Sequence, residues 1–559
     1  VQYQIHLFQN GEIENRPPCA FVLVEGLPGT GKSFVTKTLR NITRKIHGRN
    51  SADMASAPTG CAASLIGGST HCRCSHIPTG RKEFKQIPTN MTTSDSTVMR
   101  ATRLSMSKVV SRFMDEHSMD GRPTWAWLKH RHEELRRPIE VLDNEANTIV
   151  QEAIADDLLE PDVYNRPWGG IAFVYSFGDC GQLPPVMMKA MYDQSPGRPG
   201  TADYVGRIAF SEFRSPPDPE EAVSISVVMD EVLRQDDETF KRLLTRMREG
   251  NIQDEDVDFL LGRCLDKLPD EERSSFEQNA LHLVPSWKLT HQIVFEYLQS
   301  FDTPVAKFKA RLQSIRSNGI NHCVKETSYP LQNALCVGAV VMLLRNFVVE
   351  FGLMNGSIGI VREIVYESKE GPNGSSFELP LYVVVEFTHC TIGSDVNGQC
   401  FEDKPPTWIP IPVVKDHCEK KCCSIETIPL RVCIAITIHK SQGMTIGPGQ
   451  QFEKVIVYLP EAGTRNIPGL ELVGISRAMS PGCLAIGNKS SSLSEFHIKK
   501  IGTSAAYDAR RLFEQEMKDA SPPSTQLPIR EDIKNLDPCN DKSFEGGCDF
   551  LLKWYRDNF

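Results

Sequence analysis

Near the start of the chain, a short apolar run is followed by a helical pattern of apolar and polar positions. Residues 21–25 (Phe-Val-Leu-Val-Glu) predict a buried strand, and residues 34–42 predict a helix. Further strands are expected at 109–114 and 171–176, with a helical stretch at 125–159 between them. Strands that alternate with helices are typical of a parallel sheet, so the pattern predicts an α/β fold.

The pattern changes in the second half of the chain. A helical stretch is expected at 233–248, and short apolar strands follow at 340–344, 358–361 and 381–387. Gly- and Asn-containing turns separate these strands, as in a small β-barrel. Strand–helix order resumes at 432–441, which predicts that the barrel is inserted into a second α/β lobe.

Changes in composition suggest where the domains begin and end. Residues 61–105 are rich in Ser, Thr and Gly and carry several Arg and Lys residues, so they are expected to be a small insertion. Residues 195–222 are rich in Pro and acidic residues, as a linker between lobes would be. The expected domains are a first lobe at 1–60 and 106–200, the insertion at 61–105, a second lobe at 216–334 and 426–500, the β-barrel insertion at 335–425, and a partly disordered extension at 501–559.

Composition narrows the class of protein. The chain has 559 residues, of which 40% are hydrophobic and 24% charged, as in ordinary globular proteins. Its 17 cysteines have no regular spacing, which favours reduced thiols inside the cell. The expected compartment is the nucleus, with the mitochondrion as the alternative, although the cysteines do not distinguish them. No apolar run approaches a membrane span, so no membrane partner is expected, and the first residue, Val1, suggests an internal stretch of a longer protein. The net charge of −9 argues against a surface coated in basic residues, but a local nucleic-acid groove remains compatible with it.

Residues 26–33 read Gly-Leu-Pro-Gly-Thr-Gly-Lys-Ser, a phosphate-binding loop between the first strand and the first helix. Glycines let the backbone wrap an anion with its N–H groups, and the helix N-terminus adds partial positive charge. Lys32 can reach the β- and γ-phosphates, and the Ser33 hydroxyl can ligate Mg²⁺. The residues expected to bind the nucleotide are Gly26, Pro28, Gly29, Thr30, Gly31, Lys32 and Ser33.

Polar residues follow two later strands. Asp115 and Glu116 come directly after the strand at 109–114, at the edge of the sheet where ligands bind. Asp115 is expected to hold Mg²⁺ and Glu116 to activate the attacking water, although a solvated acidic turn would look the same. After the strand at 171–176, Gln182 could sense the γ-phosphate and Asp179 could support the metal shell, although the two prolines that follow also make a structural stop.

These segments, in this order, resemble the Pif-type helicases of superfamily 1B, including the helicase domains of Helitron transposons. The resemblance continues through Ala57-Pro58-Thr59-Gly60, Gly67–His71, Leu233-Arg234-Gln235, the barrel segment, Ala435–Thr445 and Val473–Ala478. It implies two RecA-like P-loop lobes with parallel sheets and ATP between them, a wedge-like insertion in the first lobe and an SH3-like β-barrel in the second. The implied activity is an ATP- and Mg²⁺-dependent DNA helicase that moves 5′ to 3′ on single-stranded DNA, opens forked DNA and serves repair, recombination or telomere maintenance.

The resemblance also implies residue roles. Arg234 and Arg477, both from the second lobe, would act as arginine fingers on the γ-phosphate. Contacts to the DNA backbone would come from Pro58, Thr59, Gly60, Thr70, His71, Thr437, His439 and Lys440.

Some alternatives stay open at this point. The Gln-containing motif that reads adenine in this family is not visible, which weakens the case for ATP over GTP. His439 could be a core histidine, and Trp125 and Trp127 are expected in the core rather than stacked on bases. The rival functions are the helicase portion of a Helitron-like transposase and a nucleic-acid-binding protein without catalysis. Protein partners cannot be inferred.

Overall fold

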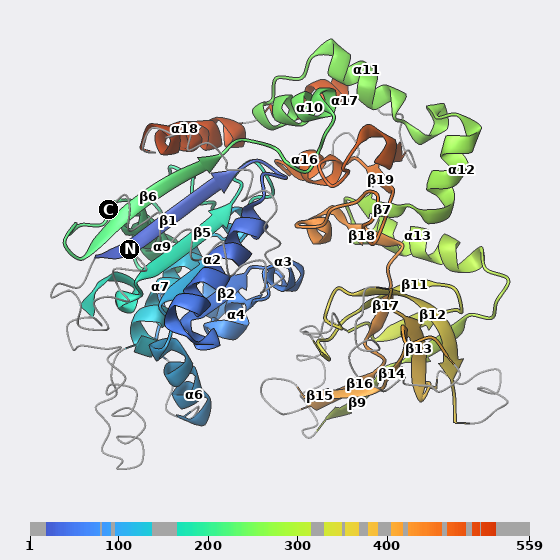
Figure 1. The fold of residues 1–559 in the computed structure, drawn as a ribbon, viewed down its shortest axis with the longest axis horizontal. Helices are drawn as coiled ribbons and strands as arrows, with labels where there is room; N and C mark the ends of the chain where they lie inside the picture. Colours follow the sequence, from blue (N-terminus) through green and yellow to red (C-terminus); the bar gives the residue numbers. More distant parts are fainter. Residues whose placement is uncertain are drawn as a thin grey trace. The chain divides into compact units, whose positions relative to one another are not determined.

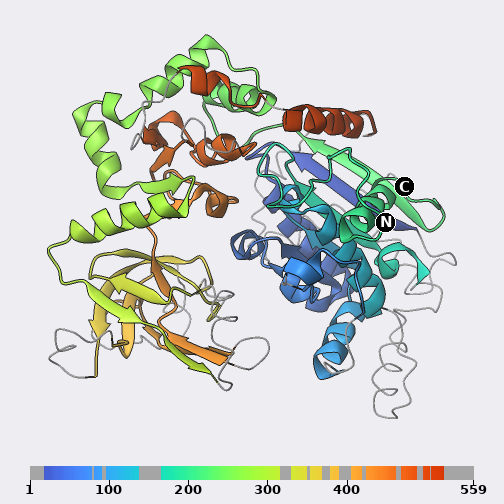
Figure 2. The ribbon, with the colours of Figure 1, turned by 180° about the vertical axis from the view of Figure 1, so that it is seen from behind.

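The computed structural model describes the chain from residue 18 to residue 520, with gaps. The described ranges are 18–78, 81–90, 96–136, 165–314, 329–348, 353–367, 378–388, 404–417, 423–460, 467–487, 495–503 and 505–520. The chain forms two compact units: the first comprises Val1–Val257, Gly463–Ser476 and Glu495–Phe559, and the second comprises Asp258–Ala462 and Arg477–Ser494 (Figures 1 and 2). Among the described residues, no helix has the length and apolar character that crossing a bilayer requires.

The first unit is built on a six-stranded parallel sheet of order β3-β2-β4-β5-β1-β6. Its central strand, β1 (Cys19–Gly26), is buried along its length, and successive side chains enter opposite cores. Phe21 and Leu23 pack with helices on one face, whereas Val22 and Val24 pack on the other. A strand covered on both faces needs a continuous apolar run, which explains the sequence before the phosphate loop.

Helices cover both faces of this sheet. Val35 and Leu39 of α2 pack on one face, and on the other an aromatic core joins Trp125 of α7 to Trp168 and to Phe213 of α9. The strands are β1 (Cys19–Gly26), β2 (Asp53–Ala57), β3 (Ser69–Thr70), β4 (Ser111–Met114), β5 (Phe173–Gly178) and β6 (Ala222–Met229); the helices are α2 (Lys32–His47), α3 (Gly60–Leu65), α4 (His71–Cys74), α5 (Arg81–Phe84), α6 (Ser96–Ser107), α7 (Arg122–Arg136), α9 (Ala202–Arg214), α10 (Glu238–Glu249), α16 (Leu470–Ile475), α17 (Glu495–Lys499) and α18 (Ala505–Ala520). α11 (Asp254–Gly262) crosses from the first unit into the second.

Most elements expected from the pattern are present, with two differences in their placement. β6 lies beyond the Pro-rich segment that we expected to link two lobes, yet it pairs along its whole length with β1. β3 lies within the expected insertion at 61–105, yet it is the edge strand next to β2. Trp125 and Trp127 are buried, as expected. The expected helical stretch at 137–159 and the extension beyond residue 520 lie outside the described residues.

The second unit combines a parallel sheet with antiparallel sheets. The parallel sheet has the order β18-β7-β19-β20, and a five-stranded antiparallel sheet has the order β14-β13-β12-β11-β17. One continuous apolar core joins the two sheets. The fold as a whole is therefore α/β with parallel and antiparallel sheets.

The remaining elements complete this unit. β8 pairs with β10, and β16 lies between β15 and β9, all antiparallel. The strands are β7 (Leu281–Val284), β8 (Ala306–Lys309), β9 (Arg311–Ser314), β10 (Gln332–Leu335), β11 (Val340–Leu343), β12 (Ile358–Val365), β13 (Tyr382–Glu386), β14 (Trp408–Pro412), β15 (Val414–His417), β16 (Cys423–Thr427), β17 (Leu430–Val432), β18 (Ala435–Thr437), β19 (Val455–Tyr458) and β20 (Leu484–Gly487); the helices are α12 (Asp270–Asn279) and α13 (Trp287–Gln299).

Candidate nucleotide site

The phosphate loop lies where the sequence placed it, between β1 and α2. Gly29 and Gly31 have φ values of 86° and 87°, in the left-handed region that favours glycine. The Lys32 ammonium donates to the carbonyl oxygens of Gly26 (2.7 Å) and Leu27 (3.0 Å). The loop therefore holds its own lysine at its centre, where the side chain can exchange these carbonyls for phosphate oxygens.

The segment after β6 closes over this loop. The backbone N–H groups of Leu233 and Arg234 both donate to the Gly29 carbonyl, at 2.9 and 3.1 Å. The Arg234 guanidinium donates to the carbonyl of Ser476, as does the Gln235 side chain. We expected Arg234 to come from the second lobe, but it belongs to the same compact unit as the phosphate loop.

The carboxylate pair follows β4, which is separated from β1 in the sheet only by β5. Asp115 and Glu116 are both buried, and Glu116 has a φ of 56°, a left-handed conformation that is uncommon for a residue other than glycine. Burial and the adjacent charge of Glu116 raise the pKa of Asp115 to about 7, against the opposing effects of the Glu116 N–H and of Lys32. A nearby cation would stabilise the ionised form of this buried carboxyl. Carboxylate and hydroxyl oxygens are the ligands that Mg²⁺ prefers, so Asp115 and Ser33 fit that ion.

Asp179 is placed differently from what we expected. Its carboxylate is fully buried and accepts two hydrogen bonds from Arg248 of α10 (2.9 and 3.1 Å) and one from Gln182 (3.2 Å). Arg248 also pairs with Glu514 of α18. These bonds occupy Asp179 within a structural ion pair, so its expected support of a metal shell is not favoured.

Gln182 is buried beside this ion pair. Its Nε2 donates to Asp179, and its Oε1 has no hydrogen-bond partner among the described residues. A buried polar atom left in this state calls for an explanation such as a ligand. Since Oε1 is an acceptor, it could take a hydrogen bond from a water molecule, and the role of Gln182 as a γ-phosphate sensor stays a prediction.

Sequence reasoning missed a buried network that connects the ends of three strands. Glu25 Oε1 lies 2.7 Å from His117 Nε2 and accepts a hydrogen bond from the Cys180 thiol at 2.9 Å. Glu25 Oε2 accepts from the Cys180 N–H, and His117 Nδ1 lies 3.1 Å from Ser176 Oγ. Because these residues follow or precede the phosphate loop, the carboxylate pair and Asp179, the network fixes these three segments relative to one another.

The charges in this network affect each other. Burial opposes ionisation of Glu25, but the charge and hydrogen bond of His117 outweigh it and lower the pKa of Glu25 to about 2. Burial likewise opposes the charged form of His117, but Glu25 outweighs it and raises the pKa of His117. Burial raises the pKa of the Cys180 thiol, so this cysteine is a hydrogen-bond donor and not a reactive thiolate. The three polar side chains therefore form a stable ion pair with a bound thiol.

The residues of the first unit that we expected to contact DNA differ in burial and in hydrogen bonding. Thr59, between Pro58 and Gly60, caps α3: its hydroxyl accepts from the Ala62 N–H at 3.2 Å. Thr70 ends β3 and is half-buried. His71 is 2% exposed, with one ring nitrogen against Ser56 and the other 3.0 Å from Asp120. A buried ring with both nitrogens engaged cannot reach a strand through its side chain in this conformation, so that part of the prediction is not supported.

The remaining predicted residues lie in the second unit. Thr437 ends β18 and is buried, and His439 and Lys440 follow it half-buried. Burial lowers the pKa of His439. Arg477 is buried and donates weakly to the Met444 carbonyl (3.4 Å), and its role as an arginine finger stays a prediction.

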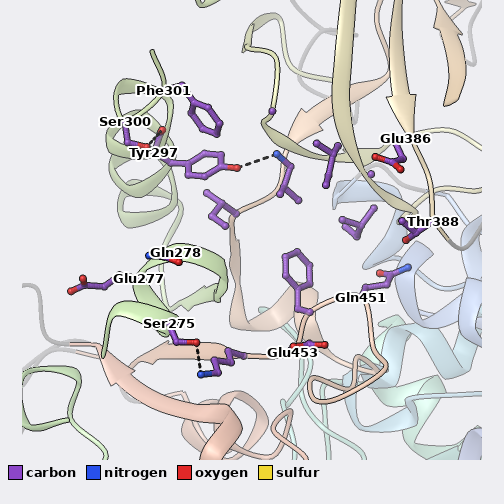
Figure 3. A pocket seen from close by; sticks show the side chains of 18 residues that line it. Ser275, Glu277, Gln278, Tyr297, Ser300, Phe301, Glu386, Thr388, Gln451 and Glu453 are labelled. Carbon is purple, nitrogen blue, oxygen red and sulfur yellow. Dashed lines mark hydrogen bonds between the residues drawn. The ribbon is translucent and has the colours of Figure 1, made fainter. Parts of the chain in front are cut away.

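The second unit also contains a cavity of about 760 Å³. Helices α12 and α13, strands β11 to β13 and the segment before β19 line it (Figure 3). The Val340 N–H donates to the hydroxyl of Tyr297 on its wall, and Lys454 donates to Ser275. None of the residues that we predicted to bind nucleotide or DNA lines this cavity.

Comparison with known proteins agrees with the resemblance in the sequence. Residues 6–196 match the PIF1-like helicase family. The ATP-dependent DNA helicase PIF1 of Homo sapiens is 25% identical over 466 residues, which cover 81% of this chain and 58% of the human protein. The ATP-dependent DNA helicase PIF1 of Xenopus laevis is 25% identical over 471 residues, with the same two shares. The chain thus spans somewhat more than half the length of these curated relatives.

Solved structures share the fold. The crystal structure of Pif1 helicase from Candida albicans aligns with a TM-score of 0.61 at 19% identity, over 93% of this chain and 98% of that chain. The Pif1 helicase from Bacteroides, crystallised in complex with ADP-AlF3 and ssDNA, aligns with a TM-score of 0.57 at 19% identity, over 92% of this chain and 98% of that chain. At these identities the likeness establishes the fold alone.

Proposed function

We propose that this chain, whose residues 6–196 match the PIF1-like helicase family, is the motor of an ATP-dependent DNA helicase. The observation that carries the proposal is the convergence of three segments at one edge of the parallel sheet. The phosphate loop follows β1, the buried carboxylate pair follows β4, and Gln182 follows β5. Ligands bind at the carboxyl ends of parallel strands, where these three segments meet.

The two parallel sheets are proposed to be two RecA-like lobes, with the antiparallel strands between residues 335 and 425 as an SH3-like barrel and part of 61–105 as a wedge. The Bacteroides relative, bound to ADP-AlF3 and ssDNA, supports ATP and single-stranded DNA as the ligands. Another aligned structure concerns unwinding at forked dsDNA by two coordinating Pif1 helicases, with a TM-score of 0.56 at 20% identity. A fork is therefore the proposed substrate.

The proposed chemistry assigns one task to each group. The Lys32 ammonium exchanges the Gly26 and Leu27 carbonyls for the β- and γ-phosphate oxygens and balances their charge. Glu116 accepts the proton of the attacking water, and Gln182 senses the γ-phosphate through that water, because its Oε1 can accept a hydrogen bond from the water. Ser33 and Asp115 would hold Mg²⁺, which neutralises the developing charge on the phosphates.

A DNA-stimulated ATPase assay tests the motor. Lys32→Ala should abolish hydrolysis but leave single-stranded DNA binding intact, because Lys32 lies in the phosphate loop. Lys37→Ala, five residues along the same helix, is the matched control and should hydrolyse ATP normally. Normal turnover in Lys32→Ala would remove the assignment of the phosphate loop.

Partial duplexes test the direction. The resemblance to superfamily 1B implies that a duplex with a 5′ single-stranded tail is opened in the presence of ATP and Mg²⁺. If only the 3′-tailed duplex opens, the proposed direction is wrong, whereas the ATPase assignment is unaffected.

A further inference from the structure

Trp287, in the second unit, has an exposed aromatic ring with two cationic side chains close to it. β7 and β18 are adjacent and parallel, and Val284 at the end of β7 lies opposite Thr437 at the end of β18. Three residues beyond these partners are Trp287, the first residue of α13, and Lys440. Figure 1 shows α13 beside β7 and β18. Both side chains therefore start from the carboxyl edge of this sheet, where parallel sheets bind their ligands.

The surroundings of the Trp287 ring are basic. The residue is 47% exposed, although most tryptophans bury their large apolar surface. The Lys440 ammonium lies 4.8 Å from the centre of the ring and the Arg431 guanidinium 5.4 Å from it. An exposed aromatic ring between two cations is the combination with which proteins hold single-stranded nucleic acid, because the ring stacks on a base and the cations pair with phosphates.

Another tryptophan of the same unit, also near two cations, serves as a comparison. Trp408 of β14 also lies near two cations, Arg362 and Lys404, at 5.8 and 5.7 Å. Trp408 lies in an antiparallel sheet and not at the carboxyl edge of a parallel one.

We propose that Trp287 stacks on a base of the single strand and that Lys440 and Arg431 bind the flanking phosphates. This inference rests on the proposed function, and it adds a contact to bases on a track otherwise expected to touch only the backbone. A cation over an exposed ring strengthens an interaction by about 2- to 5-fold, whereas a stacked base contributes about 5- to 150-fold in affinity. Two such cations together contribute about 4- to 25-fold, so exchanging them for a base is favourable over most of this range, and both cations then bind phosphates.

The experiment compares two strands with the same number of phosphates, an oligo(dT) and a strand of abasic nucleotides. Binding is measured without ATP for the wild-type chain and for Trp287→Ala, Trp287→Phe and Trp408→Ala. We expect Trp287→Ala to weaken oligo(dT) binding by about 5- to 150-fold and to change binding of the abasic strand by less than about twofold. Trp287→Phe should retain most of the affinity for oligo(dT), since phenylalanine can still stack. Trp408→Ala should leave the affinity for both strands unchanged.

Two results would overturn the inference. Equal weakening on both strands would mean that Trp287 only holds the cations in place, and unchanged binding to oligo(dT) would mean that it does not touch the strand. Failure of the proposed single-stranded DNA track looks different, because the wild-type chain would then bind neither strand, and failure of the proposed motor would show only in the ATPase assay. A misfolded variant is recognised by Trp287→Phe, which should restore oligo(dT) binding if the loss in Trp287→Ala comes from the missing ring.

Discussion

Replacing Glu25 by glutamine should destabilise the nucleotide-binding unit by about 3 kcal/mol near pH 6. The pKa of Glu25 falls from its usual 4.5 to about 2, and a shift of this size corresponds to about 3 kcal/mol at about 1.36 kcal/mol per pH unit. Both partners are almost fully buried, so solvent screens their interaction little. Removing one partner of a buried pair costs about 3–5 kcal/mol in other proteins, which agrees with this figure.

The stability difference between wild type and Glu25→Gln should depend on pH in a defined direction. A carboxyl with a depressed pKa stabilises the fold fully above its unfolded value, and this stabilisation is lost as the pH falls from about 4.5 through 2. A histidine with a raised pKa contributes fully below its unfolded value of 6.5 and loses its contribution as the pH rises through its folded value. The stability difference between wild type and Glu25→Gln should therefore be largest between about pH 4.5 and 6.5 and narrow to about 1 kcal/mol at pH 3.

The assay is urea unfolding followed by hydrogen-exchange mass spectrometry of peptides from β1 and β5, which report on this sheet independently of the second unit. Glu238→Gln is the control, because Glu238 pairs with Lys241 on an exposed helix surface, and its loss should leave the stability unchanged. A difference below about 1 kcal/mol at pH 6, or one that widens toward pH 3, would refute the reasoning.

Three other perturbations have definite outcomes. Arg248→Ala should lower the stability of the first unit by about 3–5 kcal/mol in the same assay, because it leaves the buried Asp179 carboxylate uncompensated; a loss below 1 kcal/mol would contradict this. Gly206→Ala should lower the stability of the first unit by about 1–3 kcal/mol, because the added Cβ would lie 1.7 Å from the Arg122 carbonyl oxygen. This cost should outweigh the better helix propensity of alanine. A variant as stable as wild type would show that α7 and α9 can separate. The apparent Mg²⁺ affinity in ATP hydrolysis should fall about tenfold per pH unit below pH 7, because Asp115 must lose its proton to bind the ion, and a flat profile from pH 5 to 7 would exclude Asp115 as the ligand.

Local features of the site could be predicted from the sequence, whereas long-range ones could not. The phosphate loop is one contiguous segment, and its glycines are needed because the backbone must wrap around an anion. Its position between β1 and α2 could therefore be predicted directly. The partners in the Glu25 network are 92 and 155 residues apart, and each is an ordinary residue by itself. Motif identity placed His71 at a DNA strand, but it could not reveal that Ser56 and Asp120 enclose the ring.

The domain pattern was limited in the same way. A Pro-rich segment normally ends a domain, so nothing in residues 195–222 indicated that the next strand, β6, returns to pair with β1. The parallel partner of a strand is decided by tertiary packing, which composition does not reveal. The expected boundaries of the lobes therefore stay a prediction.

The first unit is discontinuous in sequence, and this sets the order in which a ribosome can complete it. Phe513 and Met517 of α18 belong to the same core as Phe21 of β1, and Glu514 pairs with Arg248. About 250 residues separate the end of the first long segment, Val257, from α18. At synthesis rates of about 5–20 residues per second, the nascent sheet waits roughly 13–50 s for its last helix. During that interval the apolar seat of α18 is open to water, so the nascent chain should depend on chaperones until the second unit has left the ribosome.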